Sequence, residues 1–230
     1  MEMPGGKMAN RPLHFFWIVD ISGSMSVDAK IQQLNNAIKT TIPEMQKAAS
    51  ENPNAQVYVR VVAISTTAHW HIANPTPIES FKWENLSADG ETAMGHALTL
   101  VAEQLRTPPM PERSLPPVIV LITDGEPTDD FENGLKMLFD EPWGKRAIRV
   151  GIAIGKDARK DKIKKFINNL EIPVLEANNP QDLVRHIKWV STQPLKIASN
   201  PHQGNQENPN NPMINLNNNI GNANGVDDVW

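Results

Sequence analysis

The sequence contains no cysteine among its 230 residues. Disulfide frameworks and zinc ribbons are therefore excluded, and the composition suits a reducing compartment. Long apolar runs are missing as well, because the run Phe15–Val19 is far shorter than the ~20 residues that a membrane-spanning helix needs. The residues before Leu13 also lack the apolar core of a secretion signal. We therefore expect a cytoplasmic protein that does not associate with membranes.

An excess of charge of one sign is also lacking. The net charge is −4, and the Lys and Arg residues are scattered along the chain, so no basic patch for nucleic acid is apparent. Hydrophobic residues make up 40% of the chain and charged residues 21%. This composition is sufficient for a sizeable core in one α/β domain.

Apolar runs typical of buried strands alternate with segments of helical periodicity. Strands are expected at residues 13–20, 57–64, 68–73, 118–124, 147–154 and 173–175. Helices are expected at about 28–49, 93–105, 131–138, 163–167 and 183–190, with Pro43 kinking or restarting the first. This alternation predicts a doubly wound, mostly parallel sheet, with 68–73 as a short antiparallel edge strand.

Oxygen-bearing side chains follow the first expected strand. Asp20, Ser22 and Ser24 stand at alternate positions directly after the apolar run Leu13–Val19. Two more donors appear later: Thr92 in a glycine-containing loop before a helix, and Asp124 at the end of an apolar strand. Ligands bind at the carboxyl edge of an open α/β sheet, where strand order reverses. Because Mg²⁺ prefers such hard oxygen ligands, the set predicts a divalent-metal site.

Each of these residues also has an ordinary structural explanation. Asp-x-Ser-x-Ser alone is usually a turn or a helix cap, because short oxygen side chains satisfy free backbone N–H groups there. Thr92 alone is typical of a helix N-cap, and Asp124 alone of a turn after a strand. Their joint order, on strand ends that the fold would bring together, favours metal binding.

At these five residues the chain resembles the von Willebrand factor A (VWA) domain and its metal-ion-dependent adhesion site (MIDAS). The family pattern is Asp-x-Ser-x-Ser, a Thr in a glycine-rich loop and an Asp that opens Asp-Gly. The resemblance implies a Rossmann-like fold and assigns Asp20, Ser22, Ser24, Thr92 and Asp124 as ligands of Mg²⁺ or Mn²⁺. It also implies that the bound metal takes a carboxylate from a protein partner.

Other motifs extend the resemblance over roughly residues 12 to 192. The chain is similar to the bacterial VWA proteins of tellurite (toxic-anion) resistance clusters, the TerY-like group, at Asp20–Met25, Leu121–Asp129, Asn179–Asp182 and Lys188–Ser191. That resemblance implies stress or phage-defence signalling together with a Ser/Thr-kinase-like protein and a PP2C-type phosphatase. Some relatives carry a Cys-rich C-terminal module, which this chain lacks.

Enzymatic alternatives have weaker support. Gly151–Asp157 has neither the glycine spacing nor the Ser or Thr of a phosphate-binding loop, and His69 and His71 have no third ligand nearby. A Mg-dependent phosphate-handling enzyme is the alternative to a binding module, with Glu126 as the suspected base. Neutral hydroxyl ligands favour the module, an adaptor or scaffold without enzymatic activity, because they leave metal charge for a partner carboxylate.

The composition changes at about Gln193. Eleven Asn lie between Asn200 and Asn224, Lys196 is the last Lys or Arg, and no apolar period survives. We therefore expect a flexible N-terminus at 1–11, the VWA domain at 12–192 and a disordered tail at 193–230. The tail ends in Asp227, Asp228, Val229 and Trp230, an acidic pair with an aromatic anchor, which predicts a partner-binding motif.

Overall fold

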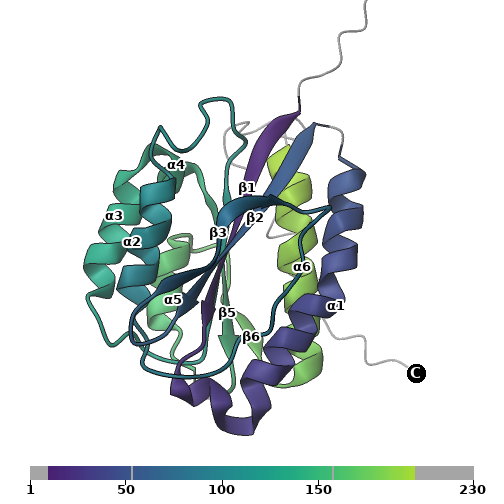
Figure 1. Cartoon of the computed structure of the whole chain (residues 1–230). Helices are drawn as coiled ribbons and strands as arrows, with labels where there is room; N and C mark the ends of the chain where they lie inside the picture. Colours follow the sequence, from purple (N-terminus) through teal and green to yellow (C-terminus); the bar gives the residue numbers. More distant parts are fainter. Residues whose placement is uncertain (1–9, 53, 157, 200–230) are drawn as a thin grey trace, which may run out of the picture.

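The computed structural model describes residues 10–52, 54–156 and 158–199. Within these residues the chain forms a six-stranded sheet in the order β3-β2-β1-β4-β5-β6, flanked by helices (Figure 1). The strands are β1 (Arg11–Asp20), β2 (Ala55–Ile64), β3 (His69–Pro77), β4 (Val118–Thr123), β5 (Ile148–Ile154) and β6 (Leu175–Ala177). Only β3 is antiparallel to its neighbour, at the edge of the sheet. The predicted doubly wound, mostly parallel sheet with an antiparallel edge strand is confirmed.

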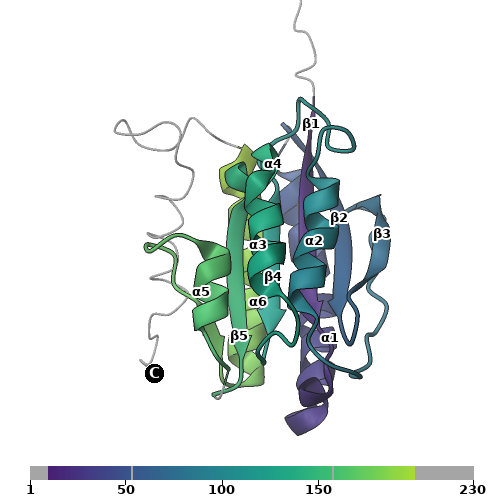
Figure 2. The ribbon, with the colours of Figure 1, turned by 90° about the vertical axis from the view of Figure 1, so that its left-hand side faces the viewer.

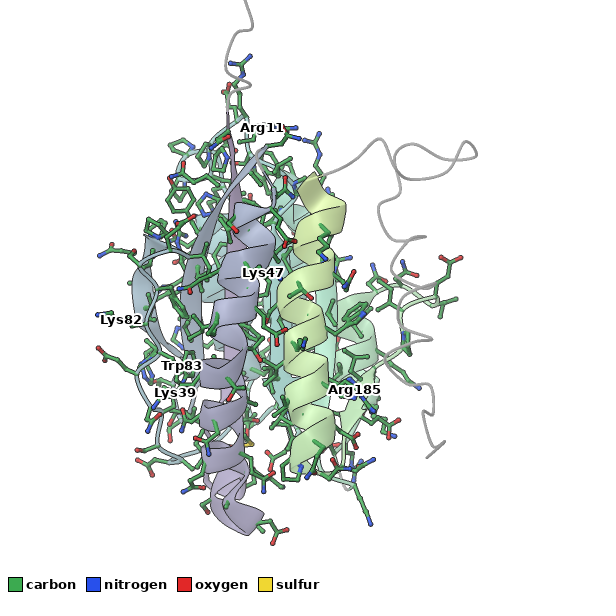
Figure 3. The ribbon with its side chains drawn as sticks, turned by 90° about the vertical axis from the view of Figure 1, so that its right-hand side faces the viewer. Arg11, Lys39, Lys47, Lys82, Trp83 and Arg185 are labelled. Atoms are coloured by element: carbon green, nitrogen blue, oxygen red, sulfur yellow. The ribbon has the colours of Figure 1, made fainter. Side chains whose placement is uncertain are left out.

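The helices cover both faces of this sheet. They are η1, a 3₁₀ helix (Gly23–Ala29), α1 (Lys30–Ser50), α2 (Met94–Gln104), α3 (Phe131–Asp140), α4 (Pro142–Arg146), α5 (Asp161–Ile167) and α6 (Pro180–Ser199). Figure 2 shows α2, α3 and α5 in front of one face. Figure 3 shows α1 and α6 side by side in front of the other.

Burial on both faces explains the sequence of the central strands. Every residue of β4 and β5 is buried, and β1 is buried from Leu13 to Asp20. A parallel strand that is covered on both sides has a continuous run of apolar residues rather than an alternation of apolar and polar residues. β3, which lies at the sheet edge, is exposed or half-buried along its whole length.

Strand order reverses between β1 and β4, and this reversal positions the candidate site. From β1 the chain adds β2 and β3 on one side, and from β4 it adds β5 and β6 on the other. The carboxyl ends of β1 and β4 therefore lie side by side, with Asp20 ending β1 and Asp124 following β4. This is the place where open α/β sheets bind their ligands.

A long connection, residues 78–93, leads from β3 back to this edge. The buried Asn35 of α1 holds it, because its side-chain oxygen accepts hydrogen bonds from Trp83 Nε1 (2.9 Å) and Leu86 N (3.0 Å). Its amide nitrogen donates to Leu86 O at 2.8 Å. Further along, Gly23 N donates to Gly90 O at 2.9 Å. The connection is thus fixed both to α1 and to the turn after β1.

Several boundaries differ from the sequence expectations. The first helix begins at Lys30 after η1 and runs through Pro43 without restarting. Pro43 is exposed, so the carbonyl that loses its N–H partner lies on the solvent side while the apolar face continues. The last strand is Leu175–Ala177 rather than 173–175.

The ends of the domain also differ from the expected boundaries. β1 begins at Arg11, inside the segment expected to be a flexible N-terminus. The last helix continues past residue 192 to Ser199, because Leu195, which is 1% exposed, still packs on the domain. Asp227, Asp228, Val229 and Trp230 lie outside the described residues. In the part of the chain that is described, no helix has the length and apolarity to cross a membrane.

Candidate metal-binding site

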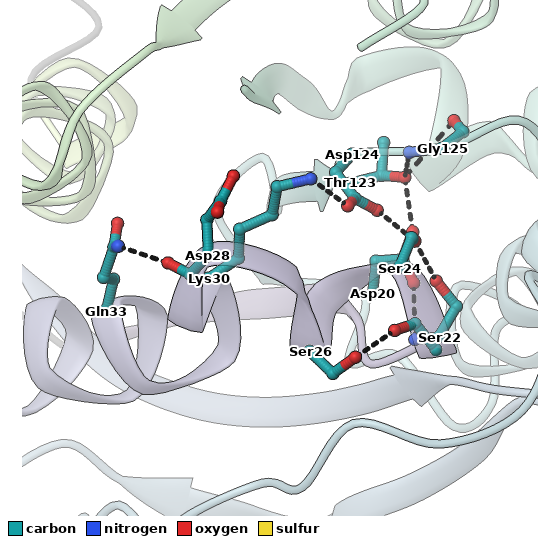
Figure 4. Close-up of polar contacts among 11 residues, drawn as sticks. Asp20, Ser22, Ser24, Ser26, Asp28, Lys30, Gln33, Thr123, Asp124 and Gly125 are labelled. Carbon is teal, nitrogen blue, oxygen red and sulfur yellow. Dashed lines mark hydrogen bonds and ion pairs between the residues drawn. The ribbon is translucent and has the colours of Figure 1, made fainter. Parts of the chain in front are cut away.

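Asp20 ends β1, Ser22 lies in the short turn that follows, and Ser24 lies at the start of η1 (Figure 4). Ser22 N donates to Asp20 Oδ1 at 2.8 Å, which folds the turn back onto the end of the strand. The two serine hydroxyls lie 3.0 Å apart. Met25, with no exposed surface, anchors the turn in the core. The alternate oxygens therefore gather on one side of the turn.

Asp124, which directly follows β4, lies next to this group. Ser24 Oγ donates to Asp124 Oδ1 at 2.7 Å, although the residues are 100 positions apart in the sequence. The Asp124 side chain is 1% exposed. The reversal of strand order thus brings the loops after β1 and β4 into direct contact.

Thr92 faces the same small space. A Cβ atom built on Gly125 would lie 3.6 Å from Thr92 Oγ1, 3.9 Å from Asp20 Oδ2 and 4.0 Å from Ser24 Oγ. Oxygens from two separate segments therefore surround one point beside the Gly125 backbone, and the preceding residue, Asp124, belongs to a third. All five residues predicted from the sequence converge here, and their role as metal ligands stays a prediction.

Hydrogen bonds fix the Thr92 loop to the loop after β4. Thr128 N donates to Thr92 O at 2.9 Å, and Thr92 N donates to Thr128 Oγ1 at 3.2 Å. Asp129 caps α2, accepting from Gly95 N at 2.8 Å and His96 N at 2.7 Å through its two carboxylate oxygens. The position of Thr92 therefore depends on residues that follow Asp124.

The electrostatics of the site favour a cation. Asp20 has no exposed surface. Burial raises the pKa of Asp20; hydrogen bonds from Thr123 and Ser22 oppose this rise, and the nearby Asp124 carboxylate adds to it. A buried carboxylate next to a second one is costly while both are charged. A divalent cation would remove that cost.

The donor set fits a hard divalent metal. It consists of two carboxylates, Asp20 and Asp124, and the hydroxyls of Ser22, Ser24 and Thr92, without nitrogen or sulfur. Oxygen ligation of this kind suits Mg²⁺ or Mn²⁺. Among the described residues no three His, Cys, Asp or Glu side chains form another metal cluster.

Two residues of the site were not predicted from the sequence. Thr123 Oγ1 donates to Asp20 Oδ2 at 2.6 Å, and Lys30 Nζ lies 2.7 Å from Asp124 Oδ2. The sequence could have indicated Thr123, because this residue ends the strand before Asp124, and that strand was expected to lie close to the strand at residues 13–20. No sequence signal indicated Lys30, since its reach depends on the backbone conformation at the end of η1.

The weaker candidates have ordinary structural roles. Gly151 lies in β5, where any Cβ would collide with Ile163, so its glycine serves packing rather than phosphate binding. The His71 ring packs near Trp83 and its Nε2 lies 3.2 Å from Glu84 O. Glu126 forms an ion pair with Arg159 at 3.0 Å.

Comparison with known proteins gives a match over most of the chain. The sequence model of the von Willebrand factor type A domain matches residues 16–187, which include all five predicted ligands. No curated protein matches the sequence.

Solved structures share the fold at low sequence identity. The chain is similar to a von Willebrand factor type A protein from Catenulispora acidiphila, with a TM-score of 0.60 and 17% identity over 80% of this chain and 43% of that one. The ArnB paralog VWA2 from Sulfolobus acidocaldarius gives 0.56 and 16%, over 77% and 44%. Proximal thread matrix protein 1 from the mussel byssus, with a zinc-occupied MIDAS motif, gives 0.58 and 18%, over 82% and 47%. This chain thus spans less than half the length of each.

Proposed function

Because this chain belongs to the von Willebrand factor type A family, we propose that it is a metal-dependent protein-binding module, an adaptor that recognises an acidic group of a partner. The observation that carries the proposal is the convergence of Asp20, Ser24 and Thr92 oxygens around one point, with Asp124 bonded to Ser24. All of them lie at the carboxyl edge of the sheet, where β1 and β4 end. Such an edge presents its ligands to a partner without involving the core.

The residues of the site would contribute to metal binding in different ways. Asp20 and Asp124 supply the negative charge, and Ser22, Ser24 and Thr92 supply neutral oxygens. Thr123 orients Asp20 through its 2.6 Å hydrogen bond. A bound Mg²⁺ or Mn²⁺ supplies a coordination position that a partner carboxylate can fill.

The enzymatic alternative has less support from the geometry. A Mg-dependent phosphate-handling enzyme needs a general base or a second metal. Glu126, the base suspected from the sequence, is engaged in an ion pair with Arg159 at 3.0 Å. The described residues hold no second cluster of metal-ligating side chains. The binding module is therefore the function that the site supports best.

We further propose that the partner belongs to a bacterial stress or phage-defence signalling complex in the cytoplasm. Support comes from the resemblance to the tellurite-resistance group at Asp20–Met25 and Leu121–Asp129. A Ser/Thr-kinase-like protein and a PP2C-type phosphatase are the first partners to test.

The test is capture of partners by the tagged full-length chain from its native host, with Mg²⁺ or with a chelator. We expect Mg²⁺-dependent capture that Asp20→Asn abolishes. Asp140→Asn is the matched control, since Asp140 is an exposed carboxylate that pairs with Lys136 on α3. Direct titration of Mg²⁺ into each variant accompanies the capture. Equal capture by wild type and Asp20→Asn, or no Mg²⁺ binding by the wild type, contradicts the proposal.

A further inference from the structure

Lys30 places an ammonium group inside the metal site. Its Nζ lies 2.7 Å from Asp124 Oδ2, and the two side chains are 20% and 1% exposed. The other oxygen of Asp124 accepts the hydrogen bond from Ser24 (Figure 4). The Asp124 carboxylate therefore accepts a hydrogen bond from the Ser24 hydroxyl and also pairs with the Lys30 ammonium group.

An unusual backbone conformation at the end of η1 positions the Lys30 side chain next to Asp124. After the extended Val27, Asp28 and Ala29 both have positive φ, 53° and 57°, and α1 begins at the next residue, Lys30. Left-handed conformations are costly for residues other than glycine, and such strain gathers at functional sites. Gln33 Nε2 donates to Asp28 O at 2.8 Å and holds the turn.

The end of β5 confines the Lys30 stem. A Cβ on Gly155, which follows β5 with φ 89°, would lie 3.4 Å from Lys30 Cε and 3.6 Å from Nζ. The Lys30 side chain thus lies between the Gly155 backbone and Asp124. Its charge is built into the site and is not a free surface charge.

The formal charges show what Lys30 adds. Asp20 and Asp124 together balance one divalent cation, and the three hydroxyl ligands are neutral. A loaded site without Lys30 would therefore carry no net charge, and a loaded site with Lys30 carries one positive charge. An open coordination position can accept a carboxylate in both cases, but the net positive charge of the second case attracts an anionic group more strongly.

We propose that Lys30 is the specificity-determining residue that makes the loaded site positive, so that it selects an Asp or Glu carboxylate of a partner. This inference rests on the proposed function. The same ammonium competes with the metal for Asp124. Lys30 therefore weakens metal binding and strengthens anion binding, two effects of opposite sign on one residue.

The experiment compares Lys30→Met and Lys30→Arg with the wild type, in the full chain. Lys39→Met is the matched control, because Lys39 is an exposed lysine on the same helix (Figure 3). Calorimetric titration with Mn²⁺ alone gives metal affinity. Line broadening of the carboxylate carbon of acetate by bound Mn²⁺, at saturating metal, gives anion affinity.

We expect Lys30→Met to bind Mn²⁺ about tenfold more tightly and acetate about tenfold more weakly, the scale expected for one close charge. Lys30→Arg and Lys39→Met should stay close to the wild type in both measurements. Circular dichroism verifies folding, and Lys30→Gln replaces the Met variant if that variant does not fold.

The proposal requires both the tighter Mn²⁺ binding and the weaker acetate binding of Lys30→Met. Unchanged or weaker Mn²⁺ binding would show that Lys30 does not compete with the metal for Asp124. Unchanged acetate binding would show that Lys30 does not select anions. A wild type that binds no Mn²⁺ contradicts the proposed function itself. A wild type that binds Mn²⁺ and a Lys30→Met variant that behaves identically overturn only the role of Lys30.

Discussion

At the scale of single residues, Asp20 is both deeply buried and a proposed metal ligand. It has no exposed surface, and its two oxygens accept hydrogen bonds from Ser22 N and Thr123 Oγ1. Burial raises its pKa, which means that the charged form is disfavoured in the metal-free domain. The charge of Asp20 therefore costs stability until a cation is bound.

Asp20→Asn separates the stability of the fold from the affinity for metal. Without metal we expect the variant to unfold at the same temperature as the wild type or higher, because a buried charge is replaced by an amide of the same shape. Saturating Mg²⁺ should raise the melting temperature of the wild type alone; the stabilisation is about 2.7 kcal/mol at a hundred times Kd. Thermal melts with Mg²⁺ and with chelator measure both effects. Equal Mg²⁺ stabilisation of both proteins contradicts the expectation.

Four of the five oxygen-bearing residues were predictable because their positions follow from strand ends, and Thr92 was predicted from the resemblance to the VWA pattern. Asp20 and Asp124 each end an apolar run, and the carboxyl ends of neighbouring parallel strands share one edge. Lys30 was not predictable. Its contact with Asp124 requires positive φ at Asp28 and Ala29, and no sequence pattern indicates that conformation for an alanine.

At the scale of elements, α2 and the loop after β4 act as one unit. Asp129 caps the first turn of α2, and Thr92, two residues before that helix, exchanges two hydrogen bonds with Thr128. A carboxylate is favourable at a helix N-terminus because of its free N–H groups and the helix dipole. The cap therefore also holds the hydroxyl of Thr92 in place.

Asp129→Ala tests this coupling, with Asp130→Ala as the matched control. Asp130 caps α3 by accepting from Asn133 N at 3.1 Å, so both changes remove a cap. We expect each to lower the free energy of unfolding by ~1–2 kcal/mol. Only Asp129→Ala should also weaken Mg²⁺ binding, several-fold, because only that cap adjoins Thr92. Urea unfolding and calorimetry give the two quantities, and equal Mg²⁺ affinity in the two variants refutes the coupling.

Element types were more predictable than element ends. The apolar runs indicated the buried strands β1, β2, β4 and β5, because strands covered on both faces have a distinctive composition. The ends depend on tertiary contacts: Leu195 extends α6 beyond the expected boundary, and exposure of Pro43 lets α1 continue. The connection at residues 78–93 depends on the buried Asn35, whose partners lie far away in the sequence.

At the scale of the whole molecule, His14 should make the fold sensitive to acid. It is 5% exposed, stacks on Tyr58, and neither ring nitrogen has a hydrogen-bond partner among the described residues. Burial and, secondarily, the nearby Arg60 lower the pKa of His14 to about 4 from 6.5. The unfolded chain therefore binds a proton below pH ~6.5 that the folded domain refuses until pH ~4, so stability falls across that window.

His14→Phe should reduce this loss. The shift corresponds to about 3 kcal/mol between pH 6.5 and 4. Urea unfolding from pH 7 to pH 4.5, with chelator throughout, gives the difference between variant and wild type at each pH. That difference should move in favour of the variant as the pH falls. His69→Gln, a change at an exposed histidine, should follow the wild type. Parallel pH profiles for wild type and His14→Phe contradict the prediction.

The partner-binding role of the C-terminal residues Asp227–Trp230 stays a prediction. Two of these residues are acidic, so their charge is opposite to that proposed for the metal-loaded site. α6 runs from Pro180, near the carboxyl edge of the sheet, to Ser199 at the opposite end of the domain (Figure 1). That distance is about 30 Å for a 20-residue helix. As an Asn-rich tether, residues 200–230 have an expected reach of roughly the same length. If the metal site is positive as proposed above, Asp227 and Asp228 have the expected reach and the opposite charge to bind it in the same or a neighbouring copy.

Deleting Val226–Trp230 should weaken complex formation without lowering the melting temperature, because the described residues form a continuous hydrophobic core among themselves. Deleting Leu216–Ile220 is the matched control, since it shortens the chain equally and keeps the acidic pair and Trp230. Capture of partners and sedimentation, each with Mg²⁺ and with chelator, distinguish a partner protein from a second copy as the docking site. If both deletions capture partners as the full chain does, and the oligomeric state is the same, the motif has no docking role.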